Sequence, residues 1–417
     1  MPPTPSSGPI SFLDIIQEFG NLTDNNKGNS TSNPDPVKLG AYRTSVNYKS
    51  VTYPLDTEVP TSGEISFADL RNKRLNVIVK VHSSSTSFQG NAKSFYNANN
   101  IEIVGNGRDK KFKNSRIHIV VTGIWGSEEG TFPRGTSNSQ TNRRTCAIRT
   151  GSWTSSGVTP TSVDLRVGGS QSQPGYIIGG GGRGGAGGAS DGETDSSESY
   201  KANGHNGCIA TSGLGLDTPL RNLEVRSPGR IQAGCGGGGG GGGAGGELSG
   251  DRSNERAGGG GGGGGSGIPD GQGGAFGYRN DSGHLNQEII AQAGTRGSSN
   301  TGGNGGRGAD NSEETSPFED SAQGGGGGGG GGINKGEGGQ GTEGAQTGAE
   351  GEEIDGTNDA DRSGEGGAGG NGDAEGQGQQ VGTGGLGGQH GLAIDVNGNE
   401  IGEITGSNRI YGRYNLV

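Results

Sequence analysis

The sequence predicts a mostly β and irregular protein. We expect short N-terminal helices, a small antiparallel β-domain, a stacked bundle of polyglycine-II helices and a C-terminal β cap. Three observations predict this fold class: a repeated turn-and-cap motif near the N-terminus, short β-branched segments before residue 178, and long glycine runs after it. The expected boundaries are residues 1–72, 73–178, 179–391 and 392–417.

The N-terminal segment contains an internal repeat. Residues 5–16 read PSSGPISFLDII and residues 60–71 read PTSGEISFADLR, which match at seven of twelve positions. In each copy a Pro and Gly turn leads to a serine with an aspartate three positions later, Ser11 with Asp14 and Ser66 with Asp69, which is the pattern of a helix N-cap. Each copy therefore predicts a short capped helix that has little core of its own and docks onto something else.

Residues 73–178 contain short segments rich in Val and Ile, such as 75–81, 101–104, 117–121 and 163–167, bounded by Gly, Asn and Ser. This pattern is typical of strands joined by turns. Both tryptophans, Trp125 and Trp153, lie here, so the segment is large enough to bury a core. Alternating apolar residues return in 392–417, which predicts a terminal β-hairpin or cap.

Glycine supplies 99 of the 417 residues, with 17 in residues 1–178 and 82 in residues 179–417. Collagen is also glycine-rich, but it requires a strict three-residue period and abundant proline, whereas these glycines form unbroken runs. Runs of eight, eight and nine glycines occupy 236–243, 258–265 and 324–332. Weaker copies occur at 179–188, 364–372 and 382–388.

A single glycine run is normally a flexible linker, because Gly loses the most backbone entropy on ordering. The recurrence of runs of similar length favours an ordered alternative. A helix with three residues per turn has no internal hydrogen bonds, so its N–H and C=O groups must be satisfied by neighbouring helices. Without Cβ atoms the backbones can approach closely enough to do so. The sequence therefore predicts a bundle whose core contains no side chains and whose non-glycine residues face outward.

The connectors between the runs are long and varied. The connector at 268–301 holds the candidate receptor-binding residues, an aromatic and basic group on a rigid support, which is what binding surfaces use. They are Phe276, Tyr278, Arg279 and His284. The alternative is that they close the end of the bundle as a small hydrophobic cap. The candidate docking residues of the N-terminal repeats are Phe12, Ile15, Ile16, Phe67 and Leu70.

The distribution of charge and the number of cysteines exclude some classes of function. Residues 1–178 carry a net charge of +6 and residues 179–417 a net charge of −17. Nucleic-acid binding requires a basic face, so we expect no nucleic-acid partner. Three cysteines do not form a disulfide framework. The alternatives are a Cys208–Cys235 bridge and reduced, inert thiols, the second being typical of a protein made in a cytosol. The sequence shows no secretion signal and no apolar run long enough to span a membrane.

Enzymatic activity is not expected, nor is any cofactor or metal. The acidic residues that a glycoside hydrolase would need, such as Glu352, Glu353 and Asp355, lie in low-complexity connectors. No phosphate-binding loop of the G-x-x-x-x-G-K-[ST] type occurs. An ice-binding protein would use the same glycine packing, but it would require a flat, regular Thr face.

Two features together resemble bacteriophage tail proteins. The P-x-S-G-x-I-S-F-x-D element, present in both copies, resembles the openings of structural proteins of T4-like and marine phages. The glycine-run region resembles the receptor-binding adhesin that caps the long tail fibre of T-even-like phages. That resemblance covers about residues 1–72 and 163–417, and it implies a polyglycine-II sandwich whose distal loops contact the host. This chain departs from the adhesin in its long N-terminal arm and additional β-domain.

The resemblance implies a tail protein of the virion, made in the host cytoplasm, that binds the host surface through loops on a polyglycine-II scaffold. Its expected partners are other tail proteins, through the N-terminal arm, and a host surface glycan or outer-membrane protein. A homotrimer is one assembly compatible with this role. The alternative is a purely structural tail or capsid component without receptor contact.

Overall fold

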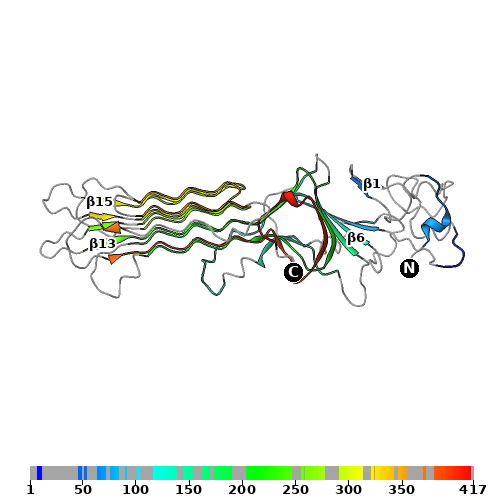
Figure 1. Cartoon of the computed structure of the whole chain (residues 1–417), viewed down its shortest axis with the longest axis horizontal. Helices are drawn as coiled ribbons and strands as arrows, with labels where there is room; N and C mark the ends of the chain where they lie inside the picture. Colours follow the sequence, from blue (N-terminus) through cyan, green and yellow to red (C-terminus); the bar gives the residue numbers. More distant parts are fainter. Residues whose placement is uncertain are drawn as a thin grey trace.

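The computed structural model has an elongated shape, with the glycine-rich segments along its long axis at one end, a curled sheet in the middle and the N-terminal segments at the other end (Figure 1). The structure describes the following residues: 7–11, 46–48, 51–53, 63–71, 76–83, 90–91, 101–103, 116–138, 144–153, 162–169, 173–189, 203–246, 255–257, 259–277, 291–312, 321–323, 325–341, 346–354, 370–371 and 380–414.

A nine-stranded sheet forms the middle of the molecule, in the order β20-β11-β8-β6-β9-β12-β21, with β3 joined to β6 and β5 to β3. Its strands are β3 (Asn76–Ser83), β5 (Ile101–Ile103), β6 (Arg116–Trp125), β8 (Ser162–Val167), β9 (Gly175–Ile178), β11 (Leu220–Val225), β12 (Arg230–Gln232), β20 (Ile401–Thr405) and β21 (Ile410–Tyr411). A second sheet has the order β19-β10-β7-β4. Its strands are β4 (Gly90–Asn91), β7 (Cys146–Arg149), β10 (Ser212–Gly215) and β19 (Ile394–Asp395).

The predicted antiparallel β-domain is wrong, because these two sheets are parallel apart from the β3–β5 pair. The predicted C-terminal hairpin is wrong for the same reason: β19, β20 and β21 pair in parallel with β10, β11 and β12. Short alternating segments look alike in parallel and antiparallel sheets. The direction of pairing follows here from the path of the chain, which returns to the same side before each new strand.

That path is a solenoid of successive coils, each with three strands. One coil consists of β7, β8 and β9, the next of β10, β11 and β12, and the third of β19, β20 and β21. Strands in the same position of each coil pair in parallel, so three ladders run through the coils. The glycine-rich segments are insertions between the last strand of one coil and the first strand of the next.

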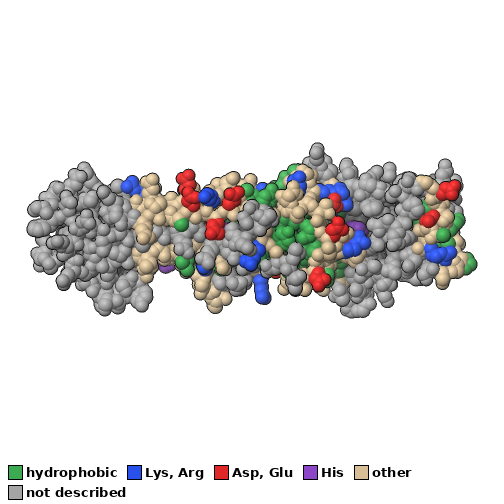
Figure 2. Space-filling view, viewed as in Figure 1, with side chains coloured by type: hydrophobic (Ala, Val, Ile, Leu, Met, Phe, Trp, Pro, Cys, Tyr) green, Lys and Arg blue, Asp and Glu red, His purple; other side chains and the backbone are tan. Residues whose placement is uncertain are grey.

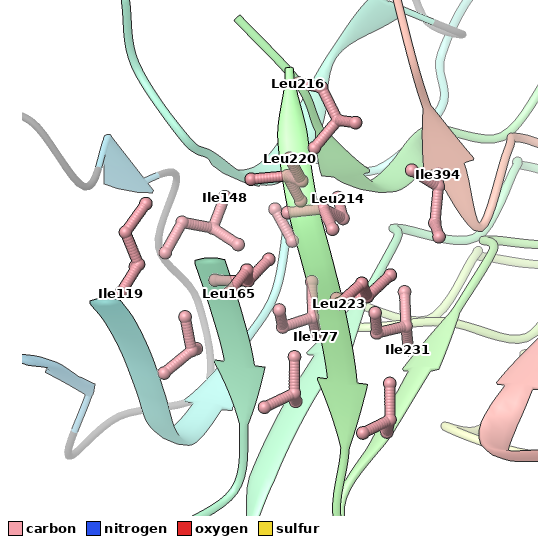
Figure 3. Close-up of a cluster of buried hydrophobic side chains, with 14 of the residues drawn as sticks. Ile119, Ile148, Leu165, Ile177, Leu214, Leu216, Leu220, Leu223, Ile231 and Ile394 are labelled. Carbon is pink, nitrogen blue, oxygen red and sulfur yellow. The ribbon is translucent and has the colours of Figure 1, made fainter. Parts of the chain in front are cut away.

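The core of the solenoid is built from aliphatic side chains stacked in register. Ile119, Leu165, Leu223 and Ile404 occupy matching positions of β6, β8, β11 and β20. Ile148, Leu214 and Ile394 form an equivalent stack on the second sheet. Figure 3 shows the two sets converging on the same interior. Because each coil contributes one layer, the coils bury one another, and no single coil has a core alone.

The glycine-rich segments bond to one another with a three-residue period. The amides of Gly182, Gly185 and Gly188 donate to the carbonyls of Cys235, Gly238 and Gly241 at 2.8 Å. This period is that of a helix with three residues per turn and no internal hydrogen bonds. The segments that bond in this way are 179–188, 203–211, 234–243, 259–267, 271–277, 291–298, 302–308, 325–332, 336–341, 346–351 and 382–391.

Segment 259–267 lies at the centre of this bundle. Its amides donate in rotation to 179–188, 325–332 and 291–298, and its carbonyls accept from 234–243, 271–277 and 302–308. Every amide from Gly259 to Gly267 has a backbone acceptor in another segment. The hydrogen bonds that a helix of this type lacks internally are therefore supplied by six neighbours.

Outer segments carry a side chain at every third residue instead of an unbroken glycine run. In segment 382–391, Thr383 and Leu386 are exposed, whereas the intervening Gly385 is buried. The side-chain oxygens of Asn203 and Asn206 each accept a hydrogen bond of 2.8 Å, from the amides of Thr383 and Leu386. Asparagine therefore satisfies outer amides that point away from any backbone carbonyl.

Two small antiparallel sheets lie at the end of the bundle far from the solenoid, with orders β14-β13-β18 and β15-β16-β17 (Figure 1). The two sheets contact each other through β13, β14, β15 and β16. Their strands are β13 (Ala244–Gly246), β14 (Glu255–Ala257), β15 (Asp310–Ser312), β16 (Ser321–Gln323), β17 (Gly370–Asn371) and β18 (Gln380–Val381). We call this end of the bundle the distal end.

The second N-terminal repeat forms a turn rather than the predicted short helix, which is a second correction to the fold class. In the second copy, Phe67–Leu70 is a single 3-10 turn, η2, capped by a hydrogen bond of 2.7 Å from the Ser66 amide to Asp69 Oδ2. The chain becomes extended at Arg71. One turn is too short to repay the cost of helix nucleation, so it does not propagate. In the first copy, residues 12–16 lie outside the described residues.

The two copies share a backbone conformation. Gly8 and Gly63 stand at equivalent positions with φ of +78° and +81°, the left-handed region that favours glycine. Arg71 of the second copy donates from Nη1 to the carbonyl of Gly8 in the first, at 2.5 Å. A separate hairpin, β1 (Val46–Tyr48) and β2 (Val51–Tyr53), lies between the copies in sequence.

Candidate binding surface at the distal end of the bundle

The distal end gathers several connectors because the glycine segments alternate in direction. Hydrogen bonds place the segment ends near residues 188, 204, 243, 259, 277, 292, 308, 325 and 382 at the same level of the bundle. Connectors 190–202, 247–254, 278–290, 313–320 and 372–379 therefore all leave from this end. At the opposite end the segments are joined by the short turns at 268–270, 299–301 and 333–335.

These distal connectors are strongly acidic. Together they contain 14 Asp and Glu residues and three Lys and Arg residues. Most of the negative charge of the glycine-rich half therefore belongs to the sequences that leave the distal end. Such a charge steers encounters toward basic partners and makes association depend on ionic strength.

Of the four candidate receptor-binding residues, the structure describes Phe276. It lies at the distal end of segment 271–277, where Gly274 and Gly277 bond to Gly262 and Gly259, and it is 41% exposed. Backbone hydrogen bonds of Gly274 and Gly277 therefore fix the chain on both sides of a partly exposed aromatic ring. Tyr278, Arg279 and His284 lie outside the described residues.

Among the described residues, two large hydrophobic side chains are exposed, Phe276 and Leu386. Leu386 is 42% exposed on segment 382–391, which bonds to 203–211 and 234–243 and not to 271–277. Sequence reasoning did not single out Leu386. The spacing of side chains in this segment could have identified it, because Thr383, Leu386 and Gln389 stand at every third position between pairs of glycines.

The N-terminal docking residues are only partly described. Leu70 is fully buried and Phe67 is half-buried. Phe12, Ile15 and Ile16 lie outside the described residues.

All three cysteines are free and buried, so the Cys208–Cys235 bridge is not formed. Burial raises the pKa of the Cys146 and Cys235 thiols to about 12 and that of Cys208 to about 11. Ser266 donates from Oγ to the sulfur of Cys235 at 3.2 Å. These thiols are therefore protonated and shielded at neutral pH, unlike reactive cysteines.

We expect the native protein to show almost no reaction with Ellman's reagent at pH 8, because its thiolates are neither populated nor accessible. In denaturant all three thiols should react. Absorbance at the thionitrobenzoate band measures both. Rapid reaction of one or more thiols under native conditions would contradict this burial.

Three further features bear on function: metal-binding clusters, membrane-spanning helices and ion pairs. Among the described residues, no group of three or more His, Cys, Asp or Glu side chains is placed to hold a metal ion. In the same residues, no helix is long and apolar enough to cross a membrane. Two of the ion pairs link neighbouring coils of the solenoid, Arg149 with Asp217 at 2.7 Å and Arg221 with Asp164 at 2.7 Å.

Comparison with known protein families, curated proteins and solved structures finds no match. The functional argument therefore depends on the geometry of this chain.

Proposed function

We propose that this protein is a host-attachment protein of a phage tail, which binds the cell surface through the connectors at the distal end of its glycine bundle. One observation carries the proposal: charged connectors and the exposed side chain of Phe276 belong to the same end of the glycine bundle. The bundle itself is a scaffold whose segments satisfy one another's backbone hydrogen bonds. A rigid scaffold lowers the entropy lost when such loops bind.

The elongated shape supports the same division of roles. The turn η2 and the strands β13 and β15 of the distal end lie toward opposite ends of the long axis (Figure 1). One end is therefore free to contact a surface while the other is attached to a larger assembly. The proposed partners are tail proteins at the N-terminal end and a surface glycan or outer-membrane protein at the distal end.

Replacing both Phe276 and Tyr278 by alanine is expected to reduce adsorption of the purified protein to host cells by at least tenfold. Aromatic anchors at the centre of an interface typically contribute about 2 kcal/mol or more, which is about thirtyfold in affinity, so a tenfold loss is a conservative expectation. Binding of fluorescently labelled protein to cells measures the effect, and thermal unfolding checks that the fold is retained.

Leu386→Ala is the matched control, since its side chain is equally exposed on a segment that does not contact 271–277. It should adsorb as the unaltered protein does. Should the aromatic variant adsorb normally and only unfold at lower temperature, the aromatic group closes the end of the bundle, and the alternative of a purely structural component gains support.

A further inference from the structure

The two ends of the solenoid differ. At the N-terminal end, β3 is covered by β5, which pairs with it in the antiparallel direction. At the C-terminal end, β20 pairs with β11 and β21 pairs with β12, and within the described residues no further strand pairs with either. The parallel ladder thus ends on an antiparallel strand at one side, and at the other side it leaves β20 as a parallel edge strand. Open edges are places where another strand can add.

The open edge also leaves apolar side chains partly uncovered. Ile401 and Ile404 of β20 are half-buried and pack against the core, whereas their partners in the previous coil, Leu220 and Leu223, are 2% and 0% exposed. Tyr414 is also half-buried against this core. Hydrophobic side chains gather in the middle of the molecule, over the solenoid (Figure 2). The stack of aliphatic layers therefore ends without a covering layer on this side.

On the outer face of the same ladder, acidic side chains of the inner strands are paired with basic side chains, and in the described part of the chain this pairing does not extend to β20. In the inner strands each carboxylate has a cation: Asp164 pairs with Arg221 at 2.7 Å, and Glu224 pairs with Arg166 and Arg226 at 2.6 Å. Glu403 stands at the position equivalent to Asp164 and is exposed. Among the described residues it has no cationic partner.

We propose that β20 is a docking edge for a β-strand of another protein, which adds to the sheet with an aliphatic residue beside Ile404 and a basic residue beside Glu403. Main-chain hydrogen bonds to an exposed edge supply affinity in this mode, and the flanking side chains supply specificity. The added strand would cover Ile401 and Ile404 and neutralise Glu403, as the next coil does for each inner strand.

A second copy of this chain fits less well. An antiparallel pair of β20 edges would bring Glu403 of each copy toward the other, and like charges on paired strands are unfavourable. Head-to-tail stacking would need an open edge at β3, which β5 occupies. The edge lies in the middle of the long axis, away from the distal connectors, so the proposal does not depend on receptor binding (Figure 1).

The experiment uses the full-length protein and two synthetic peptides based on the sequence of β8, which is Ser-Val-Asp-Leu-Arg-Val. In one peptide the aspartate is replaced by lysine, and in the control by glutamate. In register, the central leucine stands beside Ile404 and the varied residue beside Glu403. Hydrogen exchange of the amides in 401–405 reports strand addition, and fluorescence anisotropy of labelled peptide reports affinity.

We expect the lysine peptide to protect amides in 401–405 and to bind roughly tenfold more tightly than the glutamate peptide, from the combined attraction and repulsion across the pair. Glu403→Lys should reverse that preference. Because Glu403 is exposed, the variant should fold normally, and unchanged thermal unfolding will confirm it.

Three results would overturn the proposal. Absence of added protection with both peptides would show that the edge does not accept a strand. Strong protection, in the free monomer, of those amides in 401–405 that do not bond to β11 would show that the chain itself covers this edge. A dimer in sedimentation, with the same amides protected, would assign the edge to a second copy instead.

Discussion

Replacing Gly263 by alanine is expected to unfold the glycine bundle or to lower its stability by about 5 kcal/mol. A Cβ at this position would lie 1.9 Å from the carbonyl oxygen of Gly303, which is backbone and cannot rotate away. Separating the segments would also strain the bonds from Gly263 to Gly328 and from Gly238 to Gly263, of 2.9 and 2.8 Å. Overpacking and each lost buried hydrogen bond cost about 1–3 kcal/mol. The sum is comparable to the total stability of a typical domain.

Thermal unfolding followed by circular dichroism and limited proteolysis measures this change. Ala275→Val is the control, because Ala275 is an exposed residue of segment 271–277. It should change stability by less than about 0.5 kcal/mol. If Gly263→Ala unfolds at the same temperature as the unaltered protein, the segments do not pack at backbone contact. Gly240→Val tests a second interior site, where a Cβ would lie 1.9 Å from the carbonyl oxygen of Ala186.

Leu223→Ala should destabilise the solenoid by about 3 kcal/mol. Leu223 is fully buried between Leu165 and Ile404 in the aliphatic stack, and a large-to-small change at such a site leaves a cavity. Trp125 and Trp153 are both buried in the solenoid core, so tryptophan fluorescence during urea unfolding reports this region.

Asn222→Ala, on the outer face of the same strand, is the matched control and should be close to neutral. Because the two glycine insertions begin directly after β9 and β12, we further expect fluorescence and circular dichroism to record one transition. Separate transitions, with the bundle unaffected by Leu223→Ala, would show that the two parts fold independently.

The way in which the glycine segments pack follows from the backbone chemistry of glycine. A backbone without Cβ atoms has to find partners for its amides in other segments. Side chains then fit most easily where they face outward, as those of Thr383 and Leu386 do, although Cys235 and Ser266 are buried. The third-residue spacing of such side chains in the outer segments is visible in the printed sequence. It distinguishes these segments from the unbroken run at 259–265, which has neighbours on all sides.

Strand direction was not predictable from the same sequence. The segments 163–167 and 220–225 show ordinary alternation, and their partner depends on where the chain returns after a long insertion. Residues 392–414 were expected to be a separate cap, yet they supply a third coil of the solenoid. Local patterns do not encode pairings between residues so far apart. The roles of the candidate site residues stay predictions: Phe276 is 41% exposed and Leu70 is fully buried, and neither value decides between binding and packing.

The hydrogen-bond register passes without interruption from the sheet into the bundle. The pairs of β9 with β12 continue directly into the bond from Gly179 to Gln232 and then from Gly182 to Cys235. A pulling force applied at the distal connectors would therefore load many short hydrogen bonds at once in shear, along the axis of the molecule. Bonds loaded together in this direction resist rupture better than bonds that open one after another. The bundle would therefore transmit such a force to the solenoid without a flexible joint between them.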